Sequence, residues 1–258
     1  MIEGVTYDST TNLFTFYFEQ DNENFLIKLE NVDYAITQFR RCFYYGYKFS
    51  NDIDSKVKAE FTRHINFPEN FKEAKDLQLF IHKAVDYLDS QITLPQYNVV
   101  IYPLSMSELN RQMLSYLTRI TTVKYVEMEL IKELPSKIEF DYDRYKIEVL
   151  DSQINGRPRF TPQQKENSLQ KIYETIDAIH QNNYFSIAID VNKKFRQFIN
   201  RYFILKDDES KKLFESLTNN NILLIEDIET SRTTIFHILN SLRTINDKNN
   251  IAIFSLIS

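Results

Sequence analysis

The feature that most constrains the fold is a set of short apolar runs separated by segments with helical periodicity. The runs are "YNVVIYPL" from Tyr97, "YFSIAIDV" from Tyr184, "ILLI" from Ile222 and "IAIFSLI" from Ile251. Strands of a parallel sheet are apolar on both faces because helices cover both sides. We therefore predict an α/β fold in which a mostly parallel sheet is flanked by helices.

The helices of this prediction are read from apolar residues that recur every three or four positions. Two of them also begin with a capping box, Ser105 with Glu108 and Thr161 with Gln164. The apolar faces consist of Leu109, Met113, Tyr116, Leu117 and Ile120; of Leu169, Ile172, Tyr173, Ile176 and Ile179; and of Ile235, Ile238, Leu239, Leu242 and Ile245.

The first third of the chain has a different pattern, so we predict two domains. Residues 1–95 would form an N-terminal α+β extension, with strands over 4–29 and helix from about 33 to 90. Residues 96–258 would form the core, in which 123–150 read as strands and 192–217 as helix. "QINGRPRF", Gln153–Phe160, is the best loop signal in the chain.

Composition excludes several classes of protein. No apolar run approaches the roughly 20 residues that a membrane span needs, and "MIEGVTYDSTTN" lacks the basic and apolar regions of a secretory signal. A single cysteine, Cys42, cannot form an internal disulfide. The net charge of −5 gives no general attraction to nucleic acid. We expect a cytoplasmic protein.

The chemistry is concentrated in "ILLIEDIETSRTT", Ile222 to Thr234. A buried strand runs into Glu226 and Asp227, and a helix N-terminus that can bind an anion through its N–H groups follows. The hydroxyl residues and Arg232 would assist in binding a phosphate, and the two acids would accept from sugar hydroxyls or hold a divalent cation. A sugar phosphate carries both the phosphate group and the hydroxyls that such a site would bind. The positions that follow the acidic pair are Thr230, Ser231, Arg232, Thr233 and Thr234.

This stretch resembles the phosphoribosyl-pyrophosphate (PRPP) signature of the type I phosphoribosyltransferases. The resemblance implies that Glu226 and Asp227 hold the ribose 2- and 3-hydroxyls and that 230–234 surround the 5-phosphate. It also implies Mg²⁺ as cofactor and a nitrogen nucleophile as acceptor. Catalysis would consist of ribose 5-phosphate transfer with release of pyrophosphate.

Two further segments are assigned through the same resemblance. "VVIYPLSMSELNRQ" is similar to the family's pyrophosphate loop, which would consist of Leu104, Ser105, Met106 and Ser107, with Arg111 nearby. Arg157 and Arg159 in "NGRPRF" would belong to a mobile hood that excludes water from the reacting centre. The alternative for these two arginines is a solvated surface loop without a role in catalysis. The acceptor would be selected by residues 1–95 and 123–160, and residues 1–95 would also contact a second copy or a protein partner.

One departure from the signature leaves a second function open. Arg232 stands where the family has a glycine, and Thr230 stands where many members have a carboxylate near the base. A catalytically inactive protein that senses PRPP or a nucleotide is therefore the alternative to an enzyme, and a structural protein with a vestigial corner is a third. Helix capping alone accounts for one hydroxyl or acid in this stretch.

Three smaller features have competing explanations. Asp141 and Asp143 would share a face of a strand, as a cation site or as an exposed face. "KFRQFINRYF" interleaves basic and aromatic residues, as single-strand binders do, although helical spacing favours a core. The four histidines have no metal spacing, and for His237 we expect packing or exposure rather than catalysis.

Overall fold

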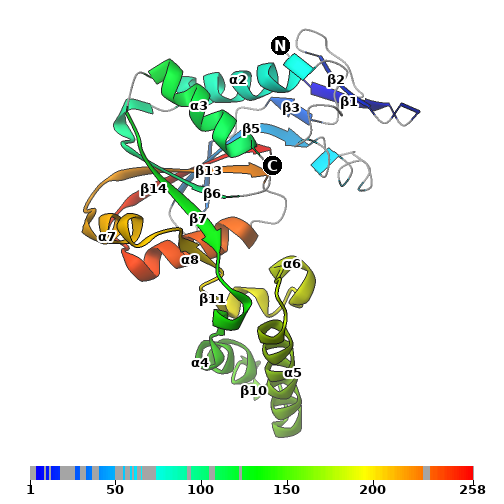
Figure 1. Cartoon of the computed structure of the whole chain (residues 1–258). Helices are drawn as coiled ribbons and strands as arrows, with labels where there is room; N and C mark the ends of the chain where they lie inside the picture. The colour runs from blue at the N-terminus through cyan, green and yellow to red at the C-terminus, as the bar shows by residue number, and fades with distance from the viewer. Residues whose placement is uncertain are drawn as a thin grey trace. The chain divides into compact units, whose positions relative to one another are not determined.

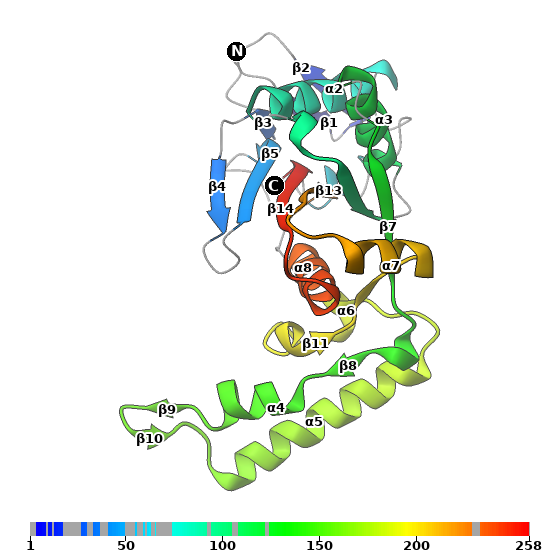
Figure 2. The same ribbon diagram turned by 90° about the vertical axis from the view of Figure 1, so that its left-hand side faces the viewer.

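The computed structural model divides the chain into two compact units, which are described separately (Figures 1 and 2). The first consists of residues 1–130, 216–230 and 248–258, and the second of residues 131–215 and 231–247. The structure describes residues 4–8, 10–11, 13–17, 27–29, 33–36, 41–49, 55, 59, 61–62, 65, 74–91, 94–104, 108–121, 124–228 and 233–257.

The first unit is built on a curved sheet whose centre is parallel. Its strand order is β7-β6-β13-β14-β5-β3-β1-β2, and β4 also pairs with β5. Each pair from β7 to β5 is parallel, and the remaining pairs are antiparallel. The strands are β1 (Gly4–Asp8), β2 (Leu13–Tyr17), β3 (Ile27–Leu29), β4 (Asp33–Ile36), β5 (Arg41–Phe49), β6 (Val99–Pro103), β7 (Val126–Lys132), β13 (Asn221–Ile228) and β14 (Asn250–Ile257).

Two helices, α2 (Ala74–Gln91) and α3 (Leu109–Thr121), lie side by side on one face of this sheet (Figure 1). A 3-10 turn, Leu94–Gln96, separates α2 from β6. The core between helices and sheet is apolar and nearly dry: Phe80 and Tyr47 are fully buried and stack at 3.8 Å, and the Tyr47 hydroxyl donates to the Phe80 carbonyl. β6 and Ile222–Glu226 of β13 are buried along their length, as parallel strands covered on both faces are. The predicted fold class is confirmed: an α/β chain with a mostly parallel central sheet flanked by helices.

The second unit is mainly helical, with short two-residue ladders. In Figure 2 the β9–β10 hairpin, α4 and β8 run along the length of α5. Its elements are β8 (Glu139–Phe140), α4 (Tyr142–Tyr145), a π-helix (Lys146–Leu150), β9 (Gln153–Ile154), β10 (Arg157–Pro158), α5 (Pro162–Gln181), α6 (Ile187–Asp190), β11 (Ile199–Asn200), β12 (Phe203–Leu205), α7 (Asp208–Ser216) and α8 (Thr233–Ile245), with 3-10 turns at Pro135–Lys137 and Arg196–Phe198.

Local sequence signals explain several of these boundaries. Thr161 accepts a hydrogen bond from the Gln164 N–H, and the Gln164 side chain accepts from the Thr161 N–H, so the predicted capping box is confirmed at the start of α5. Asn155 and Gly156 have φ values of 53° and 74°, so "NG" forms the two-residue turn of the β9–β10 hairpin. The Ser105–Glu108 box falls partly outside the described residues.

Four secondary-structure predictions are wrong. "KIEFDYDRYKIEVL" alternates like a strand, but Asp141 caps α4 by accepting from the Arg144 N–H, so the predicted strand face of Asp141 and Asp143 does not exist. The run from Tyr184 contains α6 instead of a strand. Residues 192–205 are a 3-10 turn and two short strands instead of a helix. Residues 33–49, predicted as helix, contain β4 and β5.

The predicted boundary near residue 95 stays a prediction. What the structure adds is that β5, from the N-terminal segment, hydrogen-bonds to β14 as a parallel strand of the central sheet. Of the helices in the described part of the chain, none has the length and apolar character that crossing a membrane requires.

Candidate functional site

The strand order creates a crevice between the carboxyl ends of β6 and β13. From β6 the chain passes through α3 to β7 on one side, and from β13 it passes through α8 to β14 on the other. The two parallel neighbours therefore lead away from each other, which defines a topological switch point, the usual ligand position in open α/β sheets. The stretches 104–107 and 230–234, which sequence analysis assigned to pyrophosphate and phosphate, follow these two strands in the sequence.

The register places the last residue of β6 level with a residue two positions before the end of β13. Ile101 of β6 pairs with Leu224 of β13, and two residues further along each strand are Pro103 and Glu226. Leu104 follows β6, is 38% exposed, and donates its N–H to the Leu130 carbonyl of β7. Ser105, Met106 and Ser107 lie outside the described residues, so the pyrophosphate loop stays a prediction.

Glu226 and Asp227 are the two residues of β13 that precede its last residue, Ile228. Glu226 is 5% exposed and level with the buried Ser255 of β14, whereas Asp227 is partly exposed. Successive strand residues point to opposite faces. The two carboxylates therefore flank the strand end, one on each face, and a ligand would meet both only by lying across that end.

A buried asparagine that sequence analysis did not select holds the end of β6. Asn110 in the first turn of α3 is 1% exposed and donates from Nδ2 to the Pro103 carbonyl at 3.1 Å. This bond fixes the helix start against the residue that precedes Leu104. The sequence contained a signal for this burial. Asn110 follows Leu109 directly and precedes Met113 by three positions, so it adjoins the predicted apolar face of the helix.

Arg111 is next to Asn110 but is engaged by acids. Its guanidinium lies 3.6 Å from the Glu108 carboxylate and 3.3 Å from that of Glu129. Tyr102 donates to Glu129 as well, and burial together with this bond raises the pKa of Tyr102 to about 12. The tyrosine thus stays protonated as a donor. A role for Arg111 at a pyrophosphate stays a prediction.

The other residues that sequence analysis assigned to the site lie in the second unit or outside the described residues. Thr233 and Thr234 begin α8, both partly exposed, and Thr230, Ser231 and Arg232 lie outside the described residues. Arg157 and Arg159 are exposed in and beside the β9–β10 hairpin, with the Arg159 guanidinium 5.3 Å from the centre of the Phe160 ring. Their roles as phosphate ligands and hood stay predictions.

His237, one turn into α8, is packed, as sequence analysis favoured. It is 1% exposed, and its ring lies edge-on to Tyr202 with centroids 5.6 Å apart. Burial lowers the pKa of His237 to about 4, against a smaller opposing effect of a hydrogen bond with the Ile199 backbone. The ring is therefore neutral at pH 7.

A magnesium ion at this site would need oxygen ligands from the protein or from the substrate. The described residues contain no group of three or more His, Cys, Asp or Glu side chains arranged to hold a metal. Mg²⁺ in phosphate-binding sites is commonly held by one or two carboxylates together with substrate phosphates and water. Because Glu226 and Asp227 point to opposite faces of β13, only one of the two carboxylates would hold an ion of this second kind, which arrives with the substrate.

Solved structures similar to this chain include two of one protein. They are two crystal forms, tetragonal and orthorhombic, of a hypoxanthine phosphoribosyltransferase from Staphylococcus aureus, 12% and 13% identical to this chain, each with a TM-score of 0.34. Each alignment covers 69% of this chain and 63% of the other, so the chain spans less than two thirds of the length of these structures. No family model and no curated protein matches the sequence.

Proposed function

We propose that the chain binds PRPP, or the 5-phosphate of a nucleotide, across the carboxyl ends of β6 and β13. The observation that carries the proposal is the coincidence of two independent features. The acidic pair of the PRPP-like signature lies at the end of β13 and the hydroxyl cluster follows it in the sequence, and β13 with β6 forms the topological switch point of the sheet.

Each part of the site has a distinct role in this proposal. Asp227, the more exposed acid, accepts from one ribose hydroxyl, and Glu226 accepts from the other on the opposite side of the strand end. The backbone and hydroxyls of residues 230–234 surround the 5-phosphate at the start of α8, where helix N–H groups favour an anion. The stretch 104–107, held by Asn110 through Pro103, faces the pyrophosphate.

In the enzyme form of the proposal, a nitrogen nucleophile attacks C1 of the ribose. The C1–N bond forms as the bond from C1 to the pyrophosphate oxygen breaks, and pyrophosphate leaves with the bonding electrons. Bound Mg²⁺ would neutralise charge on the leaving group. The protein contributes position and electrostatics: the acids fix the ribose, and donors at 104–107 stabilise the departing oxyanion.

The alternative is a sensor that binds the same ligand without turnover. It is favoured by Arg232, because arginine in place of glycine prevents close wrapping of the backbone if the position requires an unusual dihedral. The guanidinium would then contact the phosphate directly. Both forms of the proposal require the same ribose phosphate pocket, and they differ in whether pyrophosphate is released.

Calorimetric titration with PRPP and with nucleoside monophosphates, with and without Mg²⁺, tests the pocket. We expect saturable binding that Asp227→Asn weakens, since one charge-assisted hydrogen bond is lost. Asp143→Asn is the matched control, because this exposed aspartate lies in the second unit and pairs with Lys146 at 3.9 Å. Pyrophosphate release with a panel of nucleobases indicates the enzyme, and binding without release indicates the sensor. Absence of binding by the wild-type protein contradicts both.

A further inference from the structure

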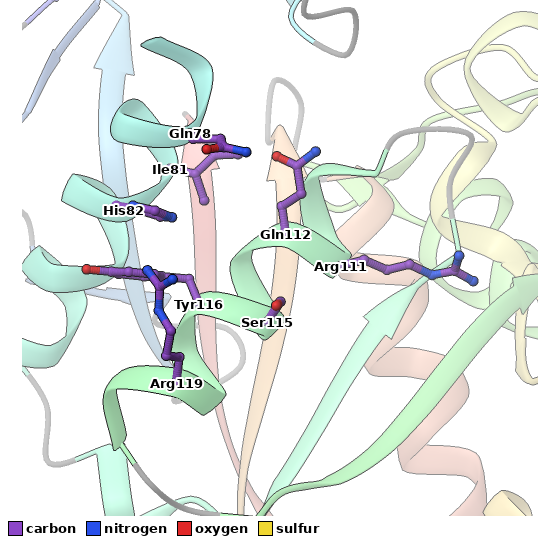
Figure 3. A pocket seen from close by; sticks show the side chains of 8 residues that line it. All are labelled: Gln78, Ile81, His82, Arg111, Gln112, Ser115, Tyr116 and Arg119. Atoms are coloured by element: carbon purple, nitrogen blue, oxygen red, sulfur yellow. The ribbon is translucent and has the colours of Figure 1, made fainter. Parts of the chain in front are cut away.

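A polar hollow lies between α2 and α3 on the outer surface of the first unit (Figure 3). Its volume is about 330 Å³, within the range of small-molecule sites. None of the residues that line it is acidic, although the chain as a whole carries a net charge of −5. The lining consists of Gln78, Ile81, His82, Arg111, Gln112, Ser115, Tyr116 and Arg119.

This hollow is separate from the switch-point crevice. It follows the middle of α3, from position 111 to 119, whereas the crevice lies at the strand ends before α3 begins. Leu109, Met113 and Leu117 are buried toward the sheet, and Ser115 and Arg119 are exposed on the outer side of the helix. A ligand in the hollow would therefore contact the helical layer and not the strand ends.

Three side chains form an aromatic and cationic wall. The His82 imidazole stacks on the Tyr116 ring with centroids 3.8 Å apart and planes 12° apart, and the Arg119 guanidinium lies 4.8 Å from the centre of the same ring (Figure 3). The Tyr116 hydroxyl donates to Asp86 at 2.9 Å. The ring is thus held in place, and it positions the imidazole and the guanidinium beside the hollow.

Arg119 and Arg111 lie on the same helix but differ in their partners. Arg111 is paired with Glu108 and Glu129 and points away from the hollow (Figure 3). Arg119 pairs with no carboxylate within the part of the chain that the structure describes. A second depression on the other side of α3, lined in part by Glu127 and Glu129, has the acids that the hollow lacks.

Neutral side chains provide further hydrogen-bond donors to the hollow. Gln78 on α2 and Gln112 on α3 approach the hollow from its two sides, and the Ser115 hydroxyl lies at its floor (Figure 3). Two amides, a hydroxyl and a guanidinium offer hydrogen bonds in several directions. This combination suits the tetrahedral oxygens of a phosphate, for which arginine provides paired donors and charge.

We propose that the hollow between α2 and α3 is a second binding site, which takes a small phosphate-bearing anion. Arg119 supplies the fixed charge, His82 adds a second charge when the bound anion favours its protonated form, and Gln78, Gln112 and Ser115 donate to the remaining oxygens. Inorganic phosphate and a sugar phosphate share this chemistry.

The charges around His82 predict the signature of binding. Burial and the nearby Arg119 lower the pKa of His82, whereas Asp86 on its own helix raises it. An anion in the hollow would offset the effect of Arg119, so the pKa of His82 would rise on binding. This shift reports on the hollow itself, because His82 lines the hollow and is not among the residues assigned to the switch point.

The test is a histidine NMR titration of the full chain with inorganic phosphate, ribose 5-phosphate and ribose at constant ionic strength. We expect saturable shifts of the His82 ring signals, and a raised His82 pKa, with the two phosphates and none with ribose. Saturation by inorganic phosphate alone assigns the site to the free anion, and tighter saturation by ribose 5-phosphate assigns it to the sugar phosphate.

Two variants make the result specific. Arg119→Gln should weaken phosphate binding about ten-fold or more, since a charge-assisted hydrogen bond pair is lost. Gln112→Glu should abolish it by placing a carboxylate in the hollow. Arg144→Gln in the second unit, where Arg144 pairs with Glu148, is the matched control and leaves it unchanged. Unmoved His82 signals, or equal binding by Arg119→Gln and wild type, overturn the proposal.

Discussion

The buried histidine of α8 makes the stability of this protein depend on pH in a calculable way. His237 is 1% exposed, and burial lowers its pKa to about 4 from 6.5. The unfolded chain therefore binds a proton at His237 before the native state does. The stabilising effect of the neutral ring is complete above pH 6.5 and is lost as the pH falls from 6.5 toward 4.

The size of this effect follows from the shift. The full difference, 6.5 − 4 = 2.5 units, corresponds to roughly 3 kcal/mol at about 1.36 kcal/mol per unit. A pH of 5 lies 1.5 units below the pKa of the histidine ring in the unfolded chain. Roughly 2 kcal/mol of stability should therefore be lost relative to pH 7.5.

Urea unfolding, followed by far-UV circular dichroism at pH values from 7.5 to 5.0, measures this loss. Other titrating groups affect wild type and variant alike, so the difference between wild type and His237→Gln isolates one ring. We expect this difference to change by roughly 2 kcal/mol over the range. Parallel pH profiles for wild type and His237→Gln would refute the argument.

Three further predictions concern the backbone and a helix end. Gly46→Ala should lower the free energy of unfolding by about 1–3 kcal/mol, measured by urea titration, because the new Cβ would lie 2.6 Å from the Ala84 Cβ; an unchanged midpoint contradicts this close approach. Gly156→Ala meets nothing within 4 Å but has a φ of +74°, so a smaller loss of about 1 kcal/mol is expected from strain, and hydrogen exchange of the hairpin amides should rise. Thr161→Ala removes the side-chain bond to the Gln164 N–H and should destabilise α5 by about 1 kcal/mol; a thermal midpoint equal to that of wild type would show that the cap contributes nothing.

Sequence patterns predicted the parts of the fold in which local chemistry and burial agree. β6, β13 and β14 are apolar runs between helical segments, and α5 combines a capping box with an inward stripe that buries Ile172, Ile176 and Ile179. Their structure follows from short-range periodicity and from backbone groups that need partners at a helix start.

The errors occur where a short pattern fits two structures. The alternation around Phe140 resembles a strand, yet Asp141 can cap a helix, and the cap prevails while Phe140 and Tyr145 pack edge to face at 5.6 Å. The run from Tyr184 is too short for periodicity to separate a buried helix from a strand. Tertiary packing decides such segments.

The strand order could not be predicted from local sequence. Nothing near Phe43 or Ile253 indicates that β5 lies parallel to β14, because pairing between distant strands depends on the whole sheet. The switch point between β6 and β13 follows from this order. Sequence analysis therefore found the polar residues after each strand but not the crevice that brings the strand ends together.

The most direct test of the proposed function is the crystal structure of the protein with PRPP and Mg²⁺. The account predicts a ribose across the end of β13, its 2- and 3-hydroxyls within hydrogen-bond distance of the Glu226 and Asp227 carboxylates, and its 5-phosphate enclosed by residues 230–234. A guanidinium of Arg232 filling that space, or a pentose bound away from the two acids, would contradict it.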